Sequence, residues 1–260
     1  MKTNPTAKGA RNRATLRTTR CFLALGSSVV LGFTLFAASS LRSTMRAEAT
    51  SCDGPGVTKS VLTTLDGVSI ATYSQGQGTT AIVLVHQVNA DHCGWSTEAF
   101  ALAKKYRVMS IDLRGYGTSQ RAKGTTAFAY RNDIAAAVGE LRTTGAKKVV
   151  LVGASMGGSA VVVAGAFINP PVDAIVAVSA PTNFKGQNAK TAAPKLAIPA
   201  RFLAAVDDGA AVSSAKSLNR SATNSPNHQV VVFANGGHGW ALLHPGSPAE
   251  AALTSFVDSL

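Results

Sequence analysis

The sequence predicts an α/β domain built on a mostly parallel central sheet of about eight strands flanked by helices. Short, nearly continuously apolar runs recur along the chain, which is typical of parallel strands covered on both faces. Stretches with helical patterning fill the intervals between these runs, and this alternation favours a parallel sheet. The chain has 260 residues, of which 46% are hydrophobic and 15% charged, as expected for one globular domain behind a leader.

The predicted elements follow one another in a regular order. Residues 60–74 hold two β-rich runs around Asp66-Gly67, a strong hairpin signal, so the sheet should begin with an antiparallel strand pair. The later apolar runs predict strands at 81–86, 107–113, 148–153, 173–180, 200–207 and 229–235. Helices are expected near 95–105, 127–144, 156–168, 210–219 and 247–260. Functional sites in such sheets form at the carboxyl ends of the strands.

The first 49 residues have the composition of an export signal. They hold eight of the 25 Lys and Arg residues against a single acidic residue, Glu48, and an uncharged apolar stretch covers residues 21–41. That stretch is also long enough to cross a bilayer if it is not cleaved, so an N-terminal membrane anchor is the alternative. Either way the remaining chain should be exported, as a secreted, periplasmic or membrane-anchored protein. Residues 50–59 are expected to be a linker and residues 60–260 the folded domain.

The net charge and the cysteine and histidine positions limit which binding partners and metals the sequence predicts. Without the leader the formal net charge falls from +12 to +5, and the basic residues are dispersed, so nucleic-acid binding is not expected. Cys52 and Cys93 are the cysteines outside the leader; export favours a disulfide between them, and two free thiols are the alternative. No grouping of His, Asp, Glu or Cys has metal-ligand spacing, and no cofactor or metal is expected.

One motif carries the strongest chemical signal. "VVLVGASMGGSAVVVAG" at 149–165 places Ser155 in a G-x-S-x-G pattern between an apolar strand and a helix. This is the context of a nucleophile turn, in which glycines relieve crowding and the helix start directs N–H groups at developing negative charge. A serine hydroxyl needs a base to become a nucleophile. The alternative is a glycine-rich turn with an incidental serine.

The partners of such a serine follow in the expected order. His238 comes after a late strand in "GGHGW", and Asp207 and Asp208 end the strand before it. A histidine oriented by a carboxylate is the usual base for a serine nucleophile. His92, His228 and His244 are interpreted as ordinary surface or loop residues.

Together these motifs resemble the α/β-hydrolase fold superfamily, from about residue 60 to residue 260. Besides the serine motif, the matching stretches are "VLVHQVNADHCGW" after the third strand, "IDLRGYGTS" after the fourth, "VDD" and "GGHGW". The resemblance implies that Ser155 is the nucleophile, His238 the base and Asp208 its orienting acid, with Asp207 as the alternative acid. It also implies that Asp112 and the turn after it brace the site.

The resemblance further implies an oxyanion hole formed by the backbone N–H groups of Met156 and Val88. Gln87 stands where the family more often has glycine, which leaves the path of this loop and the role of the Gln87 side chain open. His86 is expected to support the loop. No large cap domain is expected, because residues 182–198 are too short and polar for one, so the site should be largely open.

The predicted function is that of a serine esterase, which hydrolyses small or short-acyl carboxylic esters through an acyl-enzyme intermediate without a cofactor. Its partner would be a small ester-like substrate, with membrane association through residues 21–41 if the leader is retained. The alternatives are a thioesterase, a peptidase or a C–C hydrolase on the same fold, or a noncatalytic binding or signalling protein of the envelope.

Overall fold

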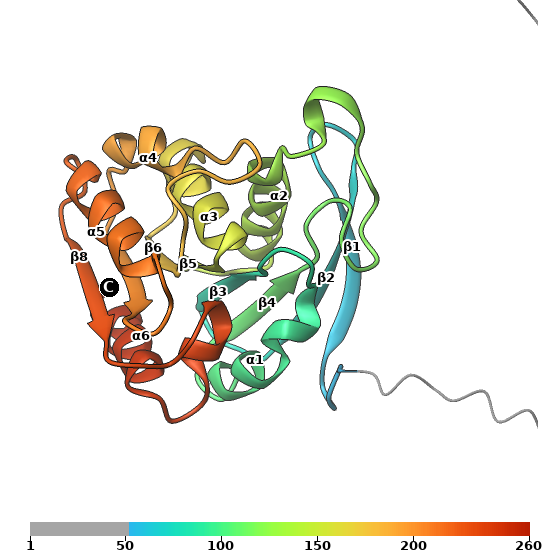
Figure 1. The fold of residues 1–260 in the computed structure, drawn as a ribbon. Coiled ribbons are helices and arrows are strands. Elements are labelled where there is room, and N and C mark those ends of the chain that lie inside the picture. Colours follow the sequence, from blue (N-terminus) through green and yellow to red (C-terminus); the bar gives the residue numbers. More distant parts are fainter. Residues whose placement is uncertain (1–51) are drawn as a thin grey trace, which may run out of the picture. The chain divides into compact units, whose positions relative to one another are not determined.

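The computed structural model describes residues 52–260. Its centre is a sheet of eight strands in the order β1-β2-β4-β3-β5-β6-β7-β8 (Figure 1). The strands are β1 (Thr58–Thr63), β2 (Ser69–Gln75), β3 (Thr80–Val85), β4 (Arg107–Ile111), β5 (Lys148–Ala154), β6 (Ala174–Val178), β7 (Ala200–Ala205) and β8 (His228–Phe233). β1, β2 and β4 pair in antiparallel fashion, and all other neighbours are parallel. The predicted fold class is confirmed.

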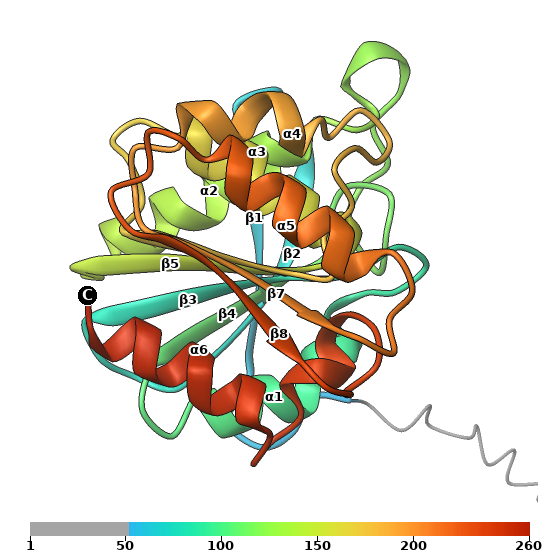
Figure 2. The ribbon, with the colours of Figure 1, turned by 60° about the vertical axis from the view of Figure 1, so that its left-hand side comes forward.

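Helices cover both faces of the sheet. One face carries α2, α3, α4 and α5, and the other carries α1 and α6 (Figure 2). The helices are α1 (Ser96–Leu102), α2 (Tyr130–Thr143), α3 (Met156–Phe167), α4 (Ala189–Ala192), α5 (Ala211–Ser221) and α6 (Pro248–Asp258). Two buried apolar clusters, one on each side of the sheet, result from this arrangement. The inner strands β3 to β7 are mostly apolar because both of their faces are covered, whereas the edge strands β1 and β8 are largely exposed.

Several element boundaries differ from the predicted ones. Strand β4 ends at Ile111 rather than at residue 113, because the next side chain, Asp112, is held by polar contacts described below. The short helix α4 was not predicted; the Asn188 side chain caps it by accepting a hydrogen bond from Thr191 N at 3.2 Å. Four residues are too few to produce a periodic sequence signal.

The segment expected to be a linker takes part in the fold. Within residues 50–59, Cys52 is disulfide-bonded to Cys93, and β1 already begins at Thr58. The export signal and membrane anchor expected in residues 1–49 lie outside the described residues. Among residues 52–260, no helix has both the length and the apolar character needed to span a membrane.

Candidate active site

Ser155 sits at a sharp turn between β5 and α3. Its backbone has φ 50° and ψ −113°, a positive-φ conformation that costs energy for a residue other than glycine. The surroundings hold it there: Ser155 N donates to Val178 O at 2.8 Å, and Ser159 N donates to Ser155 O at 3.0 Å to begin the helix. The turn therefore places the serine at the carboxyl end of a central strand.

Glycines allow the backbone to close tightly around this turn. A Cβ atom on Gly157 would lie 2.2 Å from Val85 O and 2.6 Å from His86 O, and a Cβ on Gly153 would lie 2.2 Å from Gly157 O. No side chain fits in these spaces. The first turn of α3 thus packs directly against the end of β3, which brings the loop after β3 beside the serine turn.

His238 and Asp208 form a direct pair. His238 Nδ1 lies 2.8 Å from Asp208 Oδ1 and 3.0 Å from Asp208 Oδ2. Asp207 has a different partner set, since its carboxylate accepts the backbone N–H groups of Gly236 and Gly237 at 3.2 to 3.3 Å. Of the two neighbouring aspartates, Asp208 therefore contacts the imidazole, and Asp207 holds the Gly236-Gly237 turn that precedes His238.

The Asp208 contact sets the chemistry of the His238 ring. A carboxylate only accepts hydrogen bonds, so the proton of neutral His238 is placed on Nδ1 and the lone pair on Nε2. Within residues 52–260 neither Nε2 nor the Ser155 hydroxyl has a hydrogen-bond partner, so these two groups are not bonded to each other in this structure. The His238 side chain is 48% exposed. Catalytic hydrogen bonds commonly tighten only when substrate binds.

Ser179 is a functional candidate that sequence reasoning missed. It directly follows β6 with φ 50°, and its Oγ accepts a hydrogen bond from Gly239 N at 3.0 Å. This contact anchors the residue that directly follows His238. In the sequence, only its position could have indicated Ser179, because it follows a predicted strand. That strand lies next to the one that carries Ser155.

Two backbone N–H groups near Ser155 are free to receive an anion. Met156 is the first residue of α3, so its N–H has no acceptor within the helix. The Val88 N–H also has no acceptor within the described part of the chain. These are the two groups expected to form an oxyanion hole, and neither needs to break a bond to do so.

The Gln87 side chain lies under the histidine turn. A Cβ on Gly239 would be 2.0 Å from Gln87 Oε1, and this oxygen is buried without a hydrogen-bond partner among residues 52–260. Gln87 therefore fills the space beside Gly239, which has φ 67°. The departure from the family's glycine places a side chain between the loop after β3 and the turn that carries His238.

His86 braces the same loop. Its Nδ1 donates to Gln87 O at 2.7 Å, and its Nε2 accepts from Leu113 N at 3.0 Å, so both ring nitrogens are occupied. Burial lowers the pKa of His86, which keeps the ring neutral. A neutral ring with two structural hydrogen bonds has no nitrogen left for proton transfer to a substrate.

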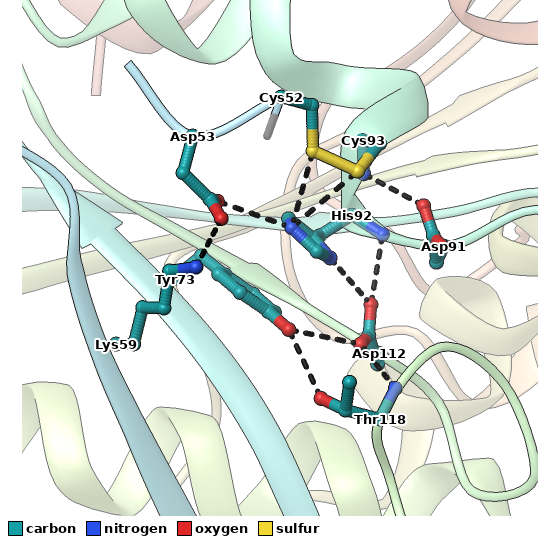
Figure 3. Close-up of a disulfide and its surroundings, with 9 residues drawn as sticks. All are labelled: Cys52, Asp53, Lys59, Tyr73, Asp91, His92, Cys93, Asp112 and Thr118. Atoms are coloured by element: carbon teal, nitrogen blue, oxygen red, sulfur yellow. Dashed lines mark hydrogen bonds and ion pairs between the residues drawn. A yellow bond between two sulfur atoms is a disulfide. The ribbon is translucent and has the colours of Figure 1, made fainter. Parts of the chain in front are cut away.

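Asp112 joins the ends of β3 and β4 through a buried network (Figure 3). Its Oδ1 accepts from His92 N at 2.8 Å and lies 3.0 Å from His92 Nδ1, while its Oδ2 accepts from Thr118 N at 3.0 Å and from Tyr73 OH at 3.3 Å. Burial alone would raise the pKa of Asp112, but the hydrogen bonds from His92 and Thr118 bring it below its ordinary value. The carboxylate is thus charged and fixed.

The interpretation of His92 as an ordinary surface or loop residue is wrong. Its ring stacks on Tyr73 with centroids 3.2 Å apart, and its Nε2 lies 3.2 Å from Asp53 Oδ1 (Figure 3). Burial would lower the pKa of His92, but Asp112 and Asp53 raise it above its ordinary value. Because each ring nitrogen faces a carboxylate, His92 is held as an imidazolium, and its side chain is only 12% exposed.

Cys52 and Cys93 form a disulfide next to this imidazole, which decides between the alternatives left open by the sequence. Both sulfurs approach His92 Nε2, at 3.4 and 3.6 Å. These three side chains are the metal-capable group found among the described residues. Since metals bind thiolates, the disulfide removes two of the three ligands.

Arg114 anchors the turn that follows β4. The guanidinium is fully buried and binds two carboxylates: Asp133 Oδ1 lies 2.7 Å from Nη2, and Asp66 Oδ2 lies 2.6 Å from Nη1. The hydrogen bonds from Arg114 hold the pKa of Asp66 well below its ordinary value. The "IDLRGYGTS" stretch thus contributes internal ion pairs that hold this turn in position beside the site.

Comparison with known proteins agrees with this architecture. Residues 80–197 match the family model described as alpha/beta hydrolase fold. A search of curated proteins finds no match. Among solved structures, an esterase from Pyrococcus furiosus is 16% identical with a TM-score of 0.64, covering 78% of this chain and 90% of that one.

Two further structures give the same result. An esterase from Exiguobacterium antarcticum is 17% identical with a TM-score of 0.64, over 77% of this chain and 100% of that one. An enol-lactonase from Burkholderia xenovorans is 15% identical with a TM-score of 0.61, over 76% and 98%. Similarity at this level of identity establishes the fold. Together with the sheet order, the turn at Ser155 and the match to the family model, it shows that this chain has the α/β-hydrolase fold.

Proposed function

We propose that the protein is a serine hydrolase that cleaves small or short-acyl carboxylic esters through an acyl-enzyme intermediate. The observation that carries this proposal is the His238–Asp208 pair on the same edge of the sheet as the strained Ser155 turn. The three residues follow the parallel strands β5, β7 and β8, and the carboxyl ends of parallel strands meet at one edge. The fold neighbours that are esterases support the reaction class.

The proposed reaction has two stages, acylation and deacylation, and His238 transfers protons in both. Ser155 Oγ attacks the ester carbonyl while His238 Nε2 takes the hydroxyl proton, and Asp208 stabilises the resulting imidazolium through Nδ1. The Met156 and Val88 N–H groups receive the oxyanion. His238 then returns the proton to the leaving alcohol, and a water molecule deprotonated by the same ring releases the acyl group and restores the serine.

The expected preference for small substrates follows from the lack of a cap over the site. Residues 182–198 form only a two-residue β-bridge between Phe184 and Gln187, the four-residue helix α4 and a 3₁₀ turn at Ala193–Lys195. No separate cap lies in this segment, and the His238 side chain is nearly half exposed. An open site offers little apolar wall for a long acyl chain, so short acyl groups should be preferred.

Hydrolysis of p-nitrophenyl esters of increasing acyl length tests this proposal. With a protein of residues 48–260, the rate should fall as the acyl chain lengthens, without a rise when the substrate forms droplets. Ser155→Ala should abolish turnover, while Ser159→Ala, whose hydroxyl donates to Pro181 O at 2.7 Å, should retain it. A sharp rise on droplets would indicate a lipase, and normal turnover by folded Ser155→Ala would overturn the assignment of the nucleophile.

We also propose that the protein is exported. The Cys52–Cys93 disulfide supports this, because such bonds persist in oxidising compartments. The intact mass of protein recovered from outside the cytoplasm would show whether the leader is cleaved. A full-length protein that sediments with membranes and resists alkaline extraction would support the anchored form, and recovery from the cytoplasm alone would contradict export.

A further inference from the structure

A cavity of about 330 Å³ lies between the loop after β3, the turn after β4 and the loop that carries Lys185. Its lining includes Asn89 and Tyr116. Asn89 directly follows Val88, and Tyr116 OH donates to the sulfur of Met156 at 3.5 Å. Two of its walls are therefore attached to the two residues whose N–H groups would hold the oxyanion. Asn89 and Tyr116 thus link this cavity to the proposed oxyanion hole.

The cavity has uncompensated positive charge. Arg114, Arg121 and Lys185 line it, and the lining contains no acidic residue from the described part of the chain. Arg114 is paired with two carboxylates, those of Asp66 and the buried Asp133. Within residues 52–260, by contrast, Arg121 donates only to Gly115 O at 3.5 Å, and Lys185 donates only to Tyr116 OH at 3.2 Å. Two cations thus face one cavity without an anion.

The Lys185 ammonium is held in position rather than loose. It lies 5.7 to 5.9 Å from the ring centroids of Phe184, Tyr116 and Phe128, which attract a cation. The loop that carries it is fastened to the loop before α2, because Gln187 Nε2 donates to Phe128 O at 2.6 Å. One of its three N–H donors is used by Tyr116, and the others are free for a ligand.

The backbone at Lys185 adopts an unfavourable conformation. Lys185 has φ 45°, in the left-handed region that a lysine adopts at an energetic cost. The next residue, Gly186, has φ 80°, and a Cβ atom added to it would meet no other atom within 4 Å, so this side of the loop is open. In this conformation the Lys185 ammonium lies beside the three rings, and Lys185 lines the cavity.

We infer that this cavity is a carboxylate subsite, so that the natural substrate is a small ester that bears a carboxylate. This inference rests on the proposed ester hydrolysis. The carboxylate would accept hydrogen bonds from Lys185, with Arg121 as a second cation, and the rings of Tyr116 and Phe128 would pack against the carbon skeleton. Lys185 is then a specificity-determining residue for the reaction at Ser155.

Matched ester pairs test this subsite on the full-length protein. The p-nitrophenyl esters of succinate and isocaproate have acyl groups of similar shape, and only the first carries a charge. For the alcohol side, para-acetoxybenzoate and para-isopropylphenyl acetate form an equivalent pair. Lys185→Met removes the ammonium and keeps the length of the side chain. Lys190→Met, in the exposed first turn of α4, is the control for loss of a positive charge outside the cavity.

We expect Lys185→Met to lower kcat/KM for the charged member of one pair by about tenfold or more, the effect of losing a charge-assisted hydrogen bond. The neutral member should change less than about twofold. The pair that responds shows whether the carboxylate belongs to the acyl or the alcohol part. Lys190→Met should leave all four rates unchanged, and the preference should weaken with salt because the cations are exposed.

Binding separates failure of the subsite from failure of the proposed function. Titration calorimetry of Ser155→Ala, with and without Lys185→Met, measures the affinity for the succinate ester without turnover. Weaker binding after Lys185→Met supports the subsite even if the wild-type chain hydrolyses no ester, in which case the proposed function alone fails. If hydrolysis proceeds but Lys185→Met affects charged and neutral esters equally, or neither, the subsite is wrong and the esterase proposal stands.

Discussion

Removing the disulfide should cost a calculable part of the stability. Cys52 and Cys93 are 41 positions apart, and a cross-link that closes such a loop lowers the entropy of the unfolded chain. The loop-closure relation gives a stabilisation of about 4 kcal/mol at 25 °C. The bond also ties the segment before β1 to the 3₁₀ turn at His92–Trp95, which follows β3.

The assay is urea unfolding of residues 48–260 and of the Cys52→Ala/Cys93→Ala double variant. The unfolding free energy of the variant should be lower by about 4 kcal/mol, and its denaturant slope larger because its unfolded chain is more expanded. Wild-type protein reduced with a phosphine should behave like the variant. Equal unfolding free energies for the oxidised and reduced proteins would refute the reasoning.

Three other predictions concern the site and its surroundings. Asp208→Asn should slow hydrolysis on the order of a thousandfold or more, because it removes the carboxylate that orients His238. Asp207→Asn should lower the rate less, because Asp207 contacts only the preceding turn. Steady-state rates of the two variants test this order, and the reverse order would transfer the role to Asp207. Gly157→Ala should distort the serine turn and abolish activity, since its Cβ would lie 2.2 Å from a backbone oxygen. Gly139→Ala, whose Cβ would meet no other atom within 4 Å, should fold and hydrolyse esters normally. An active Gly157→Ala would contradict the close packing. Burial raises the pKa of Glu98 from 4.5 to about 7, so its neutral form favours folding fully below pH 4.5 and this contribution is lost as the pH rises to about 7. Unfolding free energies across this range should decline in the wild type and decline less in Glu98→Gln, and parallel curves would show that Glu98 is not the cause.

The sequence was sufficient for the elements whose signal is local. Strands β3 to β7 are short apolar runs, and this pattern follows from burial on both faces. The hairpin at Asp66-Gly67 forms as predicted, with β1 and β2 in antiparallel register. The turn at Ser155 was foreseeable for the same reason, because the strand, the flanking glycines and the helix are contiguous.

Contacts between distant positions could not be read in this way. His92 gains its role from Asp112 and Asp53, which are 20 and 39 positions away in the chain, so nothing beside it in the sequence indicated a buried imidazolium. Lys185 meets Tyr116 across 69 positions. The direction of the Gln87 side chain depends on its fit against Gly239, which only the folded chain defines.

Labelling with a fluorophosphonate tests the central claim, that Ser155 is a nucleophile activated by His238. Such a reagent phosphonylates the serine of an active triad. We predict one adduct per chain, mapped by peptide mass spectrometry to Ser155, with no adduct in Ser155→Ala and much slower labelling in His238→Ala. A folded wild-type protein that remains unlabelled at Ser155, or is labelled equally fast without His238, would contradict it.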